Sequence, residues 1–182
     1  MQPAIFLDRD GVIIENCPEY VRSWDDVQIF DQALAALARI RHSPYLIVGV
    51  TNQSAIGRGI ISLAQAHSIN ARLVETIMHA GGRMDGIYMC PHAPEENCSC
   101  RKPQPGLLLQ AAQELGVDLN RSIMIGDALT DVLAGQAAGV NQTALVLTGR
   151  GYAQSQLPTP SGLAPYAVYA TLAEAFGHLL GE

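Results

Sequence analysis

Residues 4–13, AIFLDRDGVI, place four apolar residues directly before two aspartates, Asp8 and Asp10. An apolar run this short, ended by acids, is typical of a strand that is covered on both faces. It lacks the basic start and the longer apolar core of a signal peptide, so we expect none. The stretch therefore predicts a buried first strand that carries two carboxylates at its carboxyl end.

The rest of the chain alternates short apolar runs with segments of helical spacing. Further strands are predicted at 45–50, 86–89, 122–126, 143–148 and 166–170, and helices at 31–42, 62–82, 106–116, 130–139 and 171–180. Gly116 and Gly139 stand where glycine commonly ends a helix. Repeated strand–helix units predict an α/β fold with a mostly parallel sheet between helix layers. Residues 154–165, rich in proline and serine, predict a surface loop, and we expect residues 1–182 to form a single domain.

Composition excludes several classes of function. The chain has 182 residues, 48% of them hydrophobic, and a formal net charge of -6. No apolar run is long enough for a membrane span, and no basic stripe predicts binding to nucleic acid. We expect a soluble cytoplasmic protein that acts as a monomer.

Polar residues follow the predicted strands one after another. Asp8 and Asp10 follow the first strand, Thr51 the second, and Asp127 the strand at 122–126. A cysteine-rich segment and the pair Arg101–Lys102 follow the strand at 86–89. Because ligands bind beyond the carboxyl ends of parallel strands, we expect these groups to meet at one edge of the sheet.

These residue types suit phosphoryl transfer. A D-x-D pair alone is usually a solvated turn, but Asp8 and Asp10 point the same way in extended chain and repel unless a cation lies between them. With Asp127 they offer the hard oxygen ligands that Mg²⁺ prefers. Lys102, the only lysine in the chain, and the Thr51 hydroxyl can hold phosphoryl oxygens. One aspartate can then act as nucleophile and the other as general acid and base.

The segment CPHAPEENCSC (90–100) holds three of the four cysteines, whereas Cys17 stands alone. A disulfide would leave one of the three thiols unpaired. The four side chains of Cys90, His92, Cys98 and Cys100 make a complete tetrahedral set for zinc with no open position, so they predict a structural site. Cys100 precedes Arg101 and Lys102 directly, so we expect zinc to position both cations.

Four segments carry a family resemblance: FLDRDGVI (6–13), VTNQS (50–54), CRKPQPG (100–106) and MIGDALTD (124–131). Together they resemble the four motifs of the haloacid-dehalogenase superfamily of phosphatases. The cysteine–histidine cluster is similar to that of the branch holding histidinol-phosphate phosphatases and heptose bisphosphate 7-phosphatases. The resemblance covers about residues 4–151 and implies a Rossmann-like three-layer sandwich with a minimal cap.

The resemblance also implies roles. Asp8 is the expected nucleophile, Asp10 the general acid and base, and Thr51 and Lys102 stabilise the phosphoryl group. Asp8, the backbone carbonyl of Asp10, and Asp127 are expected to hold Mg²⁺. The expected zinc ligands are Cys90, His92, Cys98 and Cys100. Expected substrate contacts are Arg9, Tyr20, Asn52, Gln53, Ser54, Arg101 and Lys102.

The substrate is a small phosphorylated sugar in this interpretation. Residues 51–59, TNQSAIGRG, and the second proline and glycine of 101–106 favour removal of the 7-phosphate of D-glycero-D-manno-heptose 1,7-bisphosphate, in bacterial synthesis of nucleotide-activated heptose for lipopolysaccharide. The short spacer 93–97, with Ala55 and Ala128, departs from that pattern. The alternatives are a phosphatase acting on histidinol phosphate or another small phosphomonoester, and a non-catalytic zinc-stabilised binding module. Intact Asp8, Asp10, Lys102 and Asp127 speak against the binding module.

Several polar residues keep two interpretations. Arg58 and Arg150 either meet a distal phosphate or lie solvated in loops. Asp131 either orients Lys102 or a metal-bound water, or is a first-turn acid of a helix. Asn16 is a further candidate substrate contact.

Overall fold

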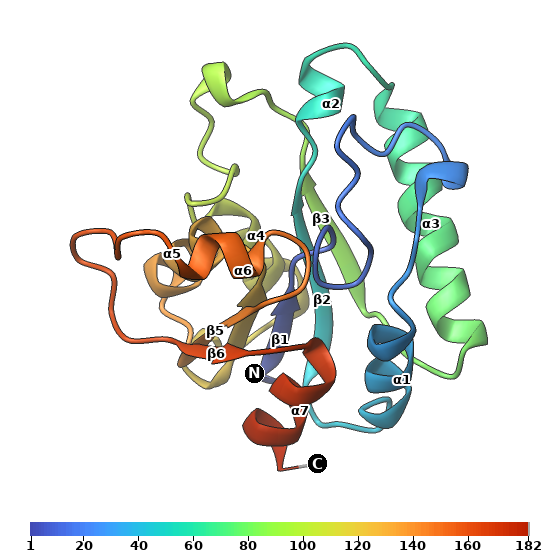
Figure 1. The fold of residues 1–182 in the computed structure, drawn as a ribbon. Coiled ribbons are helices and arrows are strands. Elements are labelled where there is room, and N and C mark those ends of the chain that lie inside the picture. Colours follow the sequence, from blue (N-terminus) through green and yellow to red (C-terminus); the bar gives the residue numbers. More distant parts are fainter. Residues whose placement is uncertain (182) are drawn as a thin grey trace.

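The computed structural model describes residues 1–181 and contains one six-stranded sheet in which every strand pairing is parallel (Figure 1). The strand order is β3-β2-β1-β4-β5-β6. The strands are β1 (Ala4–Leu7), β2 (Leu46–Asn52), β3 (Gly86–Cys90), β4 (Ile123–Gly126), β5 (Gln142–Val146) and β6 (Ala167–Tyr169). The first strand is central, as expected for a run with no polar face, and all four of its residues are buried. The predicted α/β class is confirmed.

Helices cover both faces of the sheet. They are α1 (Asp31–Arg39), α2 (Ser54–Gly57), α3 (Leu63–His79), α4 (Gly106–Leu115), α5 (Leu129–Ala138), α6 (Gly151–Ser155) and α7 (Leu172–Leu180). Short 3₁₀ turns lie at Trp24–Asp26, Pro94–Glu96 and Leu119–Arg121. Helices α1, α3 and α7 contribute to one hydrophobic cluster, and α4 and α5 contribute to another. This is the three-layer sandwich that the resemblance implied.

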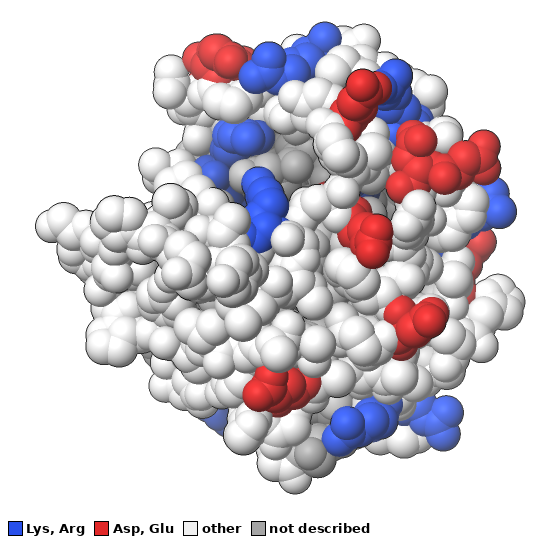
Figure 2. Space-filling model, in the orientation of Figure 1, with Lys and Arg blue, Asp and Glu red and all other residues white. Residues whose placement is uncertain are grey.

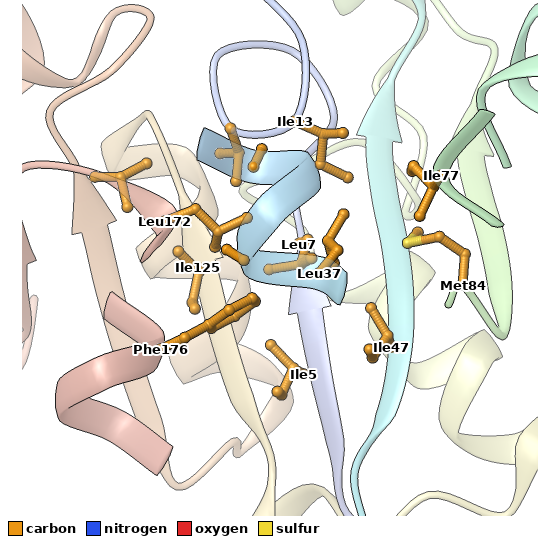
Figure 3. Close-up of a cluster of buried hydrophobic side chains, with 14 of the residues drawn as sticks. Ile5, Leu7, Ile13, Leu37, Ile47, Ile77, Met84, Ile125, Leu172 and Phe176 are labelled. Carbon is orange, nitrogen blue, oxygen red and sulfur yellow. The ribbon is translucent and has the colours of Figure 1, made fainter. Parts of the chain in front are cut away.

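The alternation of side chains in β1 divides the core in two. Ile5 and Leu7 pack into the cluster that also holds Leu37 of α1 and Phe176 of α7 (Figure 3). Ala4 and Phe6 point to the opposite cluster, beneath α4 and α5. Because successive side chains of a strand point to opposite faces, one fully apolar strand supports both helix layers and holds its carboxyl end rigidly.

Some predicted bounds were wrong. The helix predicted to residue 42 ends at Arg39, and residues 40–42 form a turn in which the Ser43 amide donates to the Ile40 carbonyl at 2.8 Å. The helix predicted to residue 82 ends at His79, ahead of Gly81, which has a φ of 85°. Strand β2 continues to Asn52, so Thr51 lies inside a strand.

The carboxyl-terminal part holds one element that the sequence did not predict. Residues 151–155 form α6, so the stretch predicted as a loop from residue 154 begins in a helix. Five residues are too few to show helical periodicity. Within residues 1–181, no helix combines the length and apolar character needed to cross a membrane.

Candidate active site

Three of the predicted site residues lie at neighbouring strand ends. Asp8 follows β1, Thr51 is the second-to-last residue of β2, and Asp127 follows β4. The Asp8 amide donates to the Ile125 carbonyl at 3.0 Å, which carries the β1–β4 ladder one residue further. All three residues are buried. The parallel register thus brings side chains more than a hundred residues apart to one edge of the sheet.

Lys102 lies at the centre of this group. Its Nζ atom donates to Asp8 Oδ1 at 2.8 Å and to the Val50 carbonyl at 2.7 Å, and it lies 2.7 Å from Asp131 Oδ1. Burial alone would lower the pKa of Lys102, but the Asp131 and Asp8 carboxylates raise it above its ordinary value. Three donors aimed in three directions suit a compact ammonium and not a planar guanidinium. Both interpretations of Asp131 are present: Oδ1 contacts Lys102, and Oδ2 accepts a hydrogen bond from the Ala128 amide at 3.0 Å in the first turn of α5.

Asn52 holds Lys102 in place through the backbone. Its Nδ2 donates to the Lys102 carbonyl at 3.1 Å, and the Lys102 amide donates to its Oδ1 at 3.0 Å. This paired bond joins the end of β2 to the loop before α4. The geometry therefore favours a positioning role for Asn52 over the predicted substrate contact.

Both carboxylate oxygens of Asp10 accept hydrogen bonds from neighbouring side chains. Its Oδ2 accepts hydrogen bonds from Arg9 Nε at 3.1 Å, Thr51 Oγ1 at 3.2 Å and Gln53 Nε2 at 3.0 Å. Its Oδ1 accepts one from Arg9 Nη2 at 3.1 Å. Burial opposes ionisation, but the Arg9 guanidinium and the hydrogen bonds from Thr51 and Gln53 lower the pKa of Asp10 below its ordinary value. Arg9 and Gln53, predicted as substrate contacts, here hold a carboxylate.

Asp127 is held by residues that sequence reasoning did not connect with it. Asn16 Nδ2 donates to its Oδ2 at 2.7 Å, and so does the Arg150 amide at 2.8 Å. Arg150 Nη2 also donates to Oδ1 at 3.0 Å. Gly11, with a φ of 86°, approaches so closely that a Cβ there would lie 2.0 Å from Asp127 Oδ2. No local pattern could pair Asn16 with a residue 111 positions away.

Three carboxylates are arranged to hold a cation. One oxygen each of Asp8, Asp127 and Asp131 can be chosen so that the three lie within 4.8 Å of one another, and all three residues are buried. Burial raises the pKa of Asp8 to about 8; Lys102 opposes this, while Asp131, Asp127 and Asp10 add to it. Like charges crowded in this way favour a divalent cation, and buried oxygen donors fit Mg²⁺. The Asp10 carboxylate is not part of this group and pairs with Arg9 instead.

The cysteine–histidine cluster fits a second metal. Cys90, His92, Cys98 and Cys100 place their ligand atoms within 4.8 Å of one another, and none of the cysteines is in a disulfide. Neighbouring donors are 3.3 to 3.6 Å apart, close to the roughly 3.8 Å edge of a tetrahedron with Zn–S bonds near 2.3 Å. Burial opposes ionisation of Cys98, but hydrogen bonds from Cys100 and Cys90 lower its pKa to about 7. The donor set and its spacing are those of a closed zinc site.

Residues 91–101, which surround this cluster, are held by two contacts of arginine side chains. Arg101 Nη1 donates to the His92 carbonyl at 3.3 Å, and Arg58 pairs with Glu95 at 3.1 Å. Arg101 and Lys102 line a hollow together with Cys98. Figure 2 shows blue side chains gathered around a hollow on this face of the molecule. Ser54 begins α2 and is half-buried, whereas Tyr20 lies exposed in a turn with a φ of 72°.

The raised pKa of Asp8 predicts a pH dependence of stability in metal-free protein. The folded-state value of about 8 lies above the ordinary 3.8, so the folded chain binds a proton that the unfolded chain has lost between these two values. The contribution of this proton to the free energy of unfolding is fully present below about pH 4 and is lost as the pH rises to about 8. We expect the Tm of the chain in chelator, relative to that of Asp8→Asn, to fall across this range. A constant difference, measured by calorimetry at six pH values, would contradict the assigned shift.

Comparison with known proteins agrees with this geometry. A family model described as HAD-hydrolase-like matches residues 99–175. A D-glycero-beta-D-manno-heptose-1,7-bisphosphate 7-phosphatase from Pasteurella multocida is 43% identical over 157 residues, covering 82% of this chain and 84% of the relative. The protein of the same name from Pseudomonas aeruginosa is 36% identical and covers 94% of this chain and 96% of its own.

A solved structure is similar over nearly the whole chain. The D,D-heptose 1,7-bisphosphate phosphatase from B. bronchiseptica, complexed with magnesium and phosphate, superposes with a TM-score of 0.89. It is 35% identical, and the match covers 98% of each chain. The chain therefore belongs to the family of D-glycero-beta-D-manno-heptose-1,7-bisphosphate 7-phosphatases, a group of HAD-like phosphomonoester hydrolases.

Proposed function

We propose that this chain removes the 7-phosphate of D-glycero-D-manno-heptose 1,7-bisphosphate by way of an aspartyl-phosphate on Asp8. The observation that carries the chemistry is the position of Asp8, which contacts the Lys102 ammonium at 2.8 Å and lies in a cluster with two further buried carboxylates. The names of the relatives support the substrate. As part of the same proposal, the enzyme is a cytoplasmic monomer.

In the first step, an Asp8 oxygen attacks the phosphorus atom of the 7-phosphate. The new Asp8–phosphorus bond forms as the bond from phosphorus to the sugar oxygen breaks. Asp10 gives a proton to the departing sugar oxygen, which leaves as an alcohol. The Lys102 ammonium lies beside Asp8 and stabilises the charge that the phosphoryl oxygens carry in the transition state, whereas the Thr51 hydroxyl donates a hydrogen bond to Asp10.

In the second step, Asp10 takes a proton from a water molecule. That water oxygen attacks phosphorus, the bond to Asp8 breaks, and inorganic phosphate leaves with Asp8 restored. The lowered pKa of Asp10 in the free site suits this base step. The arrival of a phosphate dianion next to Asp10 raises its pKa, because like charges favour the protonated form, and this prepares the acid step.

Two metals belong to the proposal. Asp8, Asp127 and the Asp10 carbonyl would hold Mg²⁺, which when bound supplies positive charge to the phosphoryl group and favours ionised Asp8. The cluster of Cys90, His92, Cys98 and Cys100 would hold zinc, which has a structural role there. Hydrogen bonds from Asn16 and the Arg150 amide orient Asp127, and Lys102 orients Asp8.

The substrate is tested by comparing kcat/KM for heptose 1,7-bisphosphate with that for heptose 7-phosphate, histidinol phosphate and fructose 1,6-bisphosphate. We expect kcat/KM for heptose 1,7-bisphosphate to exceed that for histidinol phosphate by at least about a hundredfold, well within the roughly 10⁴–10⁵ that a site hydrogen-bonded to its substrate can reach. Preference for histidinol phosphate would overturn the substrate while leaving the chemistry intact. No magnesium-dependent phosphate release from any ester would revive the non-catalytic binding module.

Zinc removal is expected to affect substrate binding more than the nucleophile. Without the ion, the four ligand side chains of residues 90–100 are no longer tied together, and the backbone that carries Arg101 and Lys102 loosens. KM should rise about tenfold, equivalent to roughly 1.4 kcal/mol of loop ordering. Hydrogen exchange of residues 91–101 and steady-state kinetics, measured with zinc removed and Mg²⁺ restored, check this. Unchanged exchange and unchanged KM would show that the metal does not position the two cations.

A further inference from the structure

Arg9 is a buried cation that the chemistry does not use directly. Its side chain is only 2% exposed. Two of its nitrogen atoms donate to Asp10, and Nη1 donates to Asn70 Oδ1 at 2.8 Å. A guanidinium so deeply buried needs partners on every side, because each unpaired N–H in a low dielectric is costly.

Asn70 fixes the third side of that guanidinium. It lies on α3, 61 residues from Arg9 in sequence, and is itself buried. Among residues 1–181, its amide nitrogen donates only to the weak acceptor Met89 Sδ, at 3.6 Å. The strong hydrogen bond of the Asn70 side chain is therefore the one it accepts from Arg9, and helix α3 supports the guanidinium.

The consequence is that the two oxygens of Asp10 are not equivalent. Oδ2 accepts three hydrogen bonds, from Arg9, Thr51 and Gln53, whereas Oδ1 accepts one, from Arg9. An oxygen with three donors has no lone pair left for a proton. Oδ1 keeps one, and the Asp10 side chain is 21% exposed, so that a leaving group or a water molecule can reach it.

We propose that Asn70, acting through Arg9, is a positioning residue that presents Oδ1 of Asp10 as the proton-transferring oxygen. The inference rests on the proposed role of Asp10 as general acid and base. Removing the Asn70 acceptor frees one edge of the guanidinium, which can then rotate and carry the Asp10 carboxylate out of line. The damage falls on proton transfer and not on the nucleophile or on phosphate binding.

The experiment uses Asn70→Leu, which keeps the approximate shape of the side chain and removes the acceptor. The magnesium- and zinc-loaded enzyme is assayed with a sugar phosphate, whose alkoxide needs a proton to leave, and with p-nitrophenyl phosphate, whose phenolate does not. Single-turnover measurements with enzyme in excess give kcat/KM even where hydrolysis is slow. We expect about a tenfold loss on the sugar phosphate, part of the 10²–10⁴ that general acid catalysis supplies, and less than a threefold loss on the aryl ester.

Controls separate this result from a loss of fold. Thr143→Val removes another buried polar group, outside the site, and should leave both substrates unaffected. Asn70→Ala serves if leucine disturbs packing. In an Asp10→Asn background, Asn70→Leu should change kcat/KM by less than threefold, since its effect runs through Asp10. Equal loss on both esters, no loss on either, or full additivity with Asp10→Asn would overturn the inference.

Failure of this inference and failure of the proposed substrate give different results. If the proposed substrate is wrong, the wild-type enzyme shows no preference for heptose 1,7-bisphosphate. If the Asn70 inference is wrong, only the ratio of alkyl to aryl turnover in the Asn70 variants shows it, and this ratio can be measured with whichever alkyl phosphate the wild type hydrolyses.

Discussion

Replacing Asp8 with asparagine is expected to lower kcat by about four orders of magnitude or more, the scale of losing a catalytic nucleophile. The amide keeps the shape of the side chain but cannot form the acyl-phosphate. The substitution also removes the negative charge of Asp8, which Lys102 contacts at 2.8 Å. Steady-state phosphate release and calorimetry on the same preparations measure both effects.

The control for this variant is Asp31→Asn, which makes the same chemical change at the exposed start of α1. It should retain wild-type kcat. Asp8→Asn should remain folded, because a neutral side chain in this buried site relieves repulsion with Asp131 and Asp127. Residual activity within tenfold of wild type would rule out Asp8 as the nucleophile.

Replacing Lys102 with methionine is expected to damage both stability and turnover. The ammonium lies between Asp8 and Asp131, with both carboxylates and the lysine itself nearly inaccessible to water. Removing the cation leaves two buried carboxylates facing each other, which costs about 3 kcal/mol of unfolding free energy. It also removes a charge that faces the transferring phosphoryl group, so kcat/KM should fall about a thousandfold.

Two comparisons sharpen the Lys102 result. Arg121→Met removes an exposed cation outside the site and should change neither quantity appreciably. Lys102→Arg keeps the charge but cannot direct three donors at Asp8, Asp131 and the Val50 carbonyl, so we expect it to remain strongly impaired. A methionine variant that unfolds at the wild-type denaturant concentration would contradict the central position given to the ammonium.

The sequence was sufficient for the architecture because each strand carries its own signal. Four apolar residues at 4–7 favoured a strand covered on both faces, and the residue that follows is a carboxylate. In a parallel sheet every strand end lies at the same edge, so the grouping of Asp8, Thr51 and Asp127 followed from chain order. The cysteine cluster was equally local, since all four side chains lie within eleven positions.

The residues that hold the carboxylates could not be predicted in the same way. Asn70 on α3 meets Arg9 from 61 positions away in sequence, and Asn16, Asp127 and Arg150 come together from three separate segments of the chain. No spacing rule links such positions. Arg9, Asn52 and Gln53 were expected to contact substrate, yet their side chains hydrogen-bond within the protein. Arg9 binds Asp10 and Asn70, Asn52 binds Lys102, and Gln53 binds Asp10 and Thr51.

The most direct test of the account is ³¹P NMR of the purified enzyme acting on D-glycero-D-manno-heptose 1,7-bisphosphate with Mg²⁺. We predict that the resonance of the phosphate on C7 disappears as inorganic phosphate grows, while that of the anomeric 1-phosphate persists. Loss of the anomeric resonance first, or no change in either while histidinol phosphate is hydrolysed under the same conditions, would contradict it.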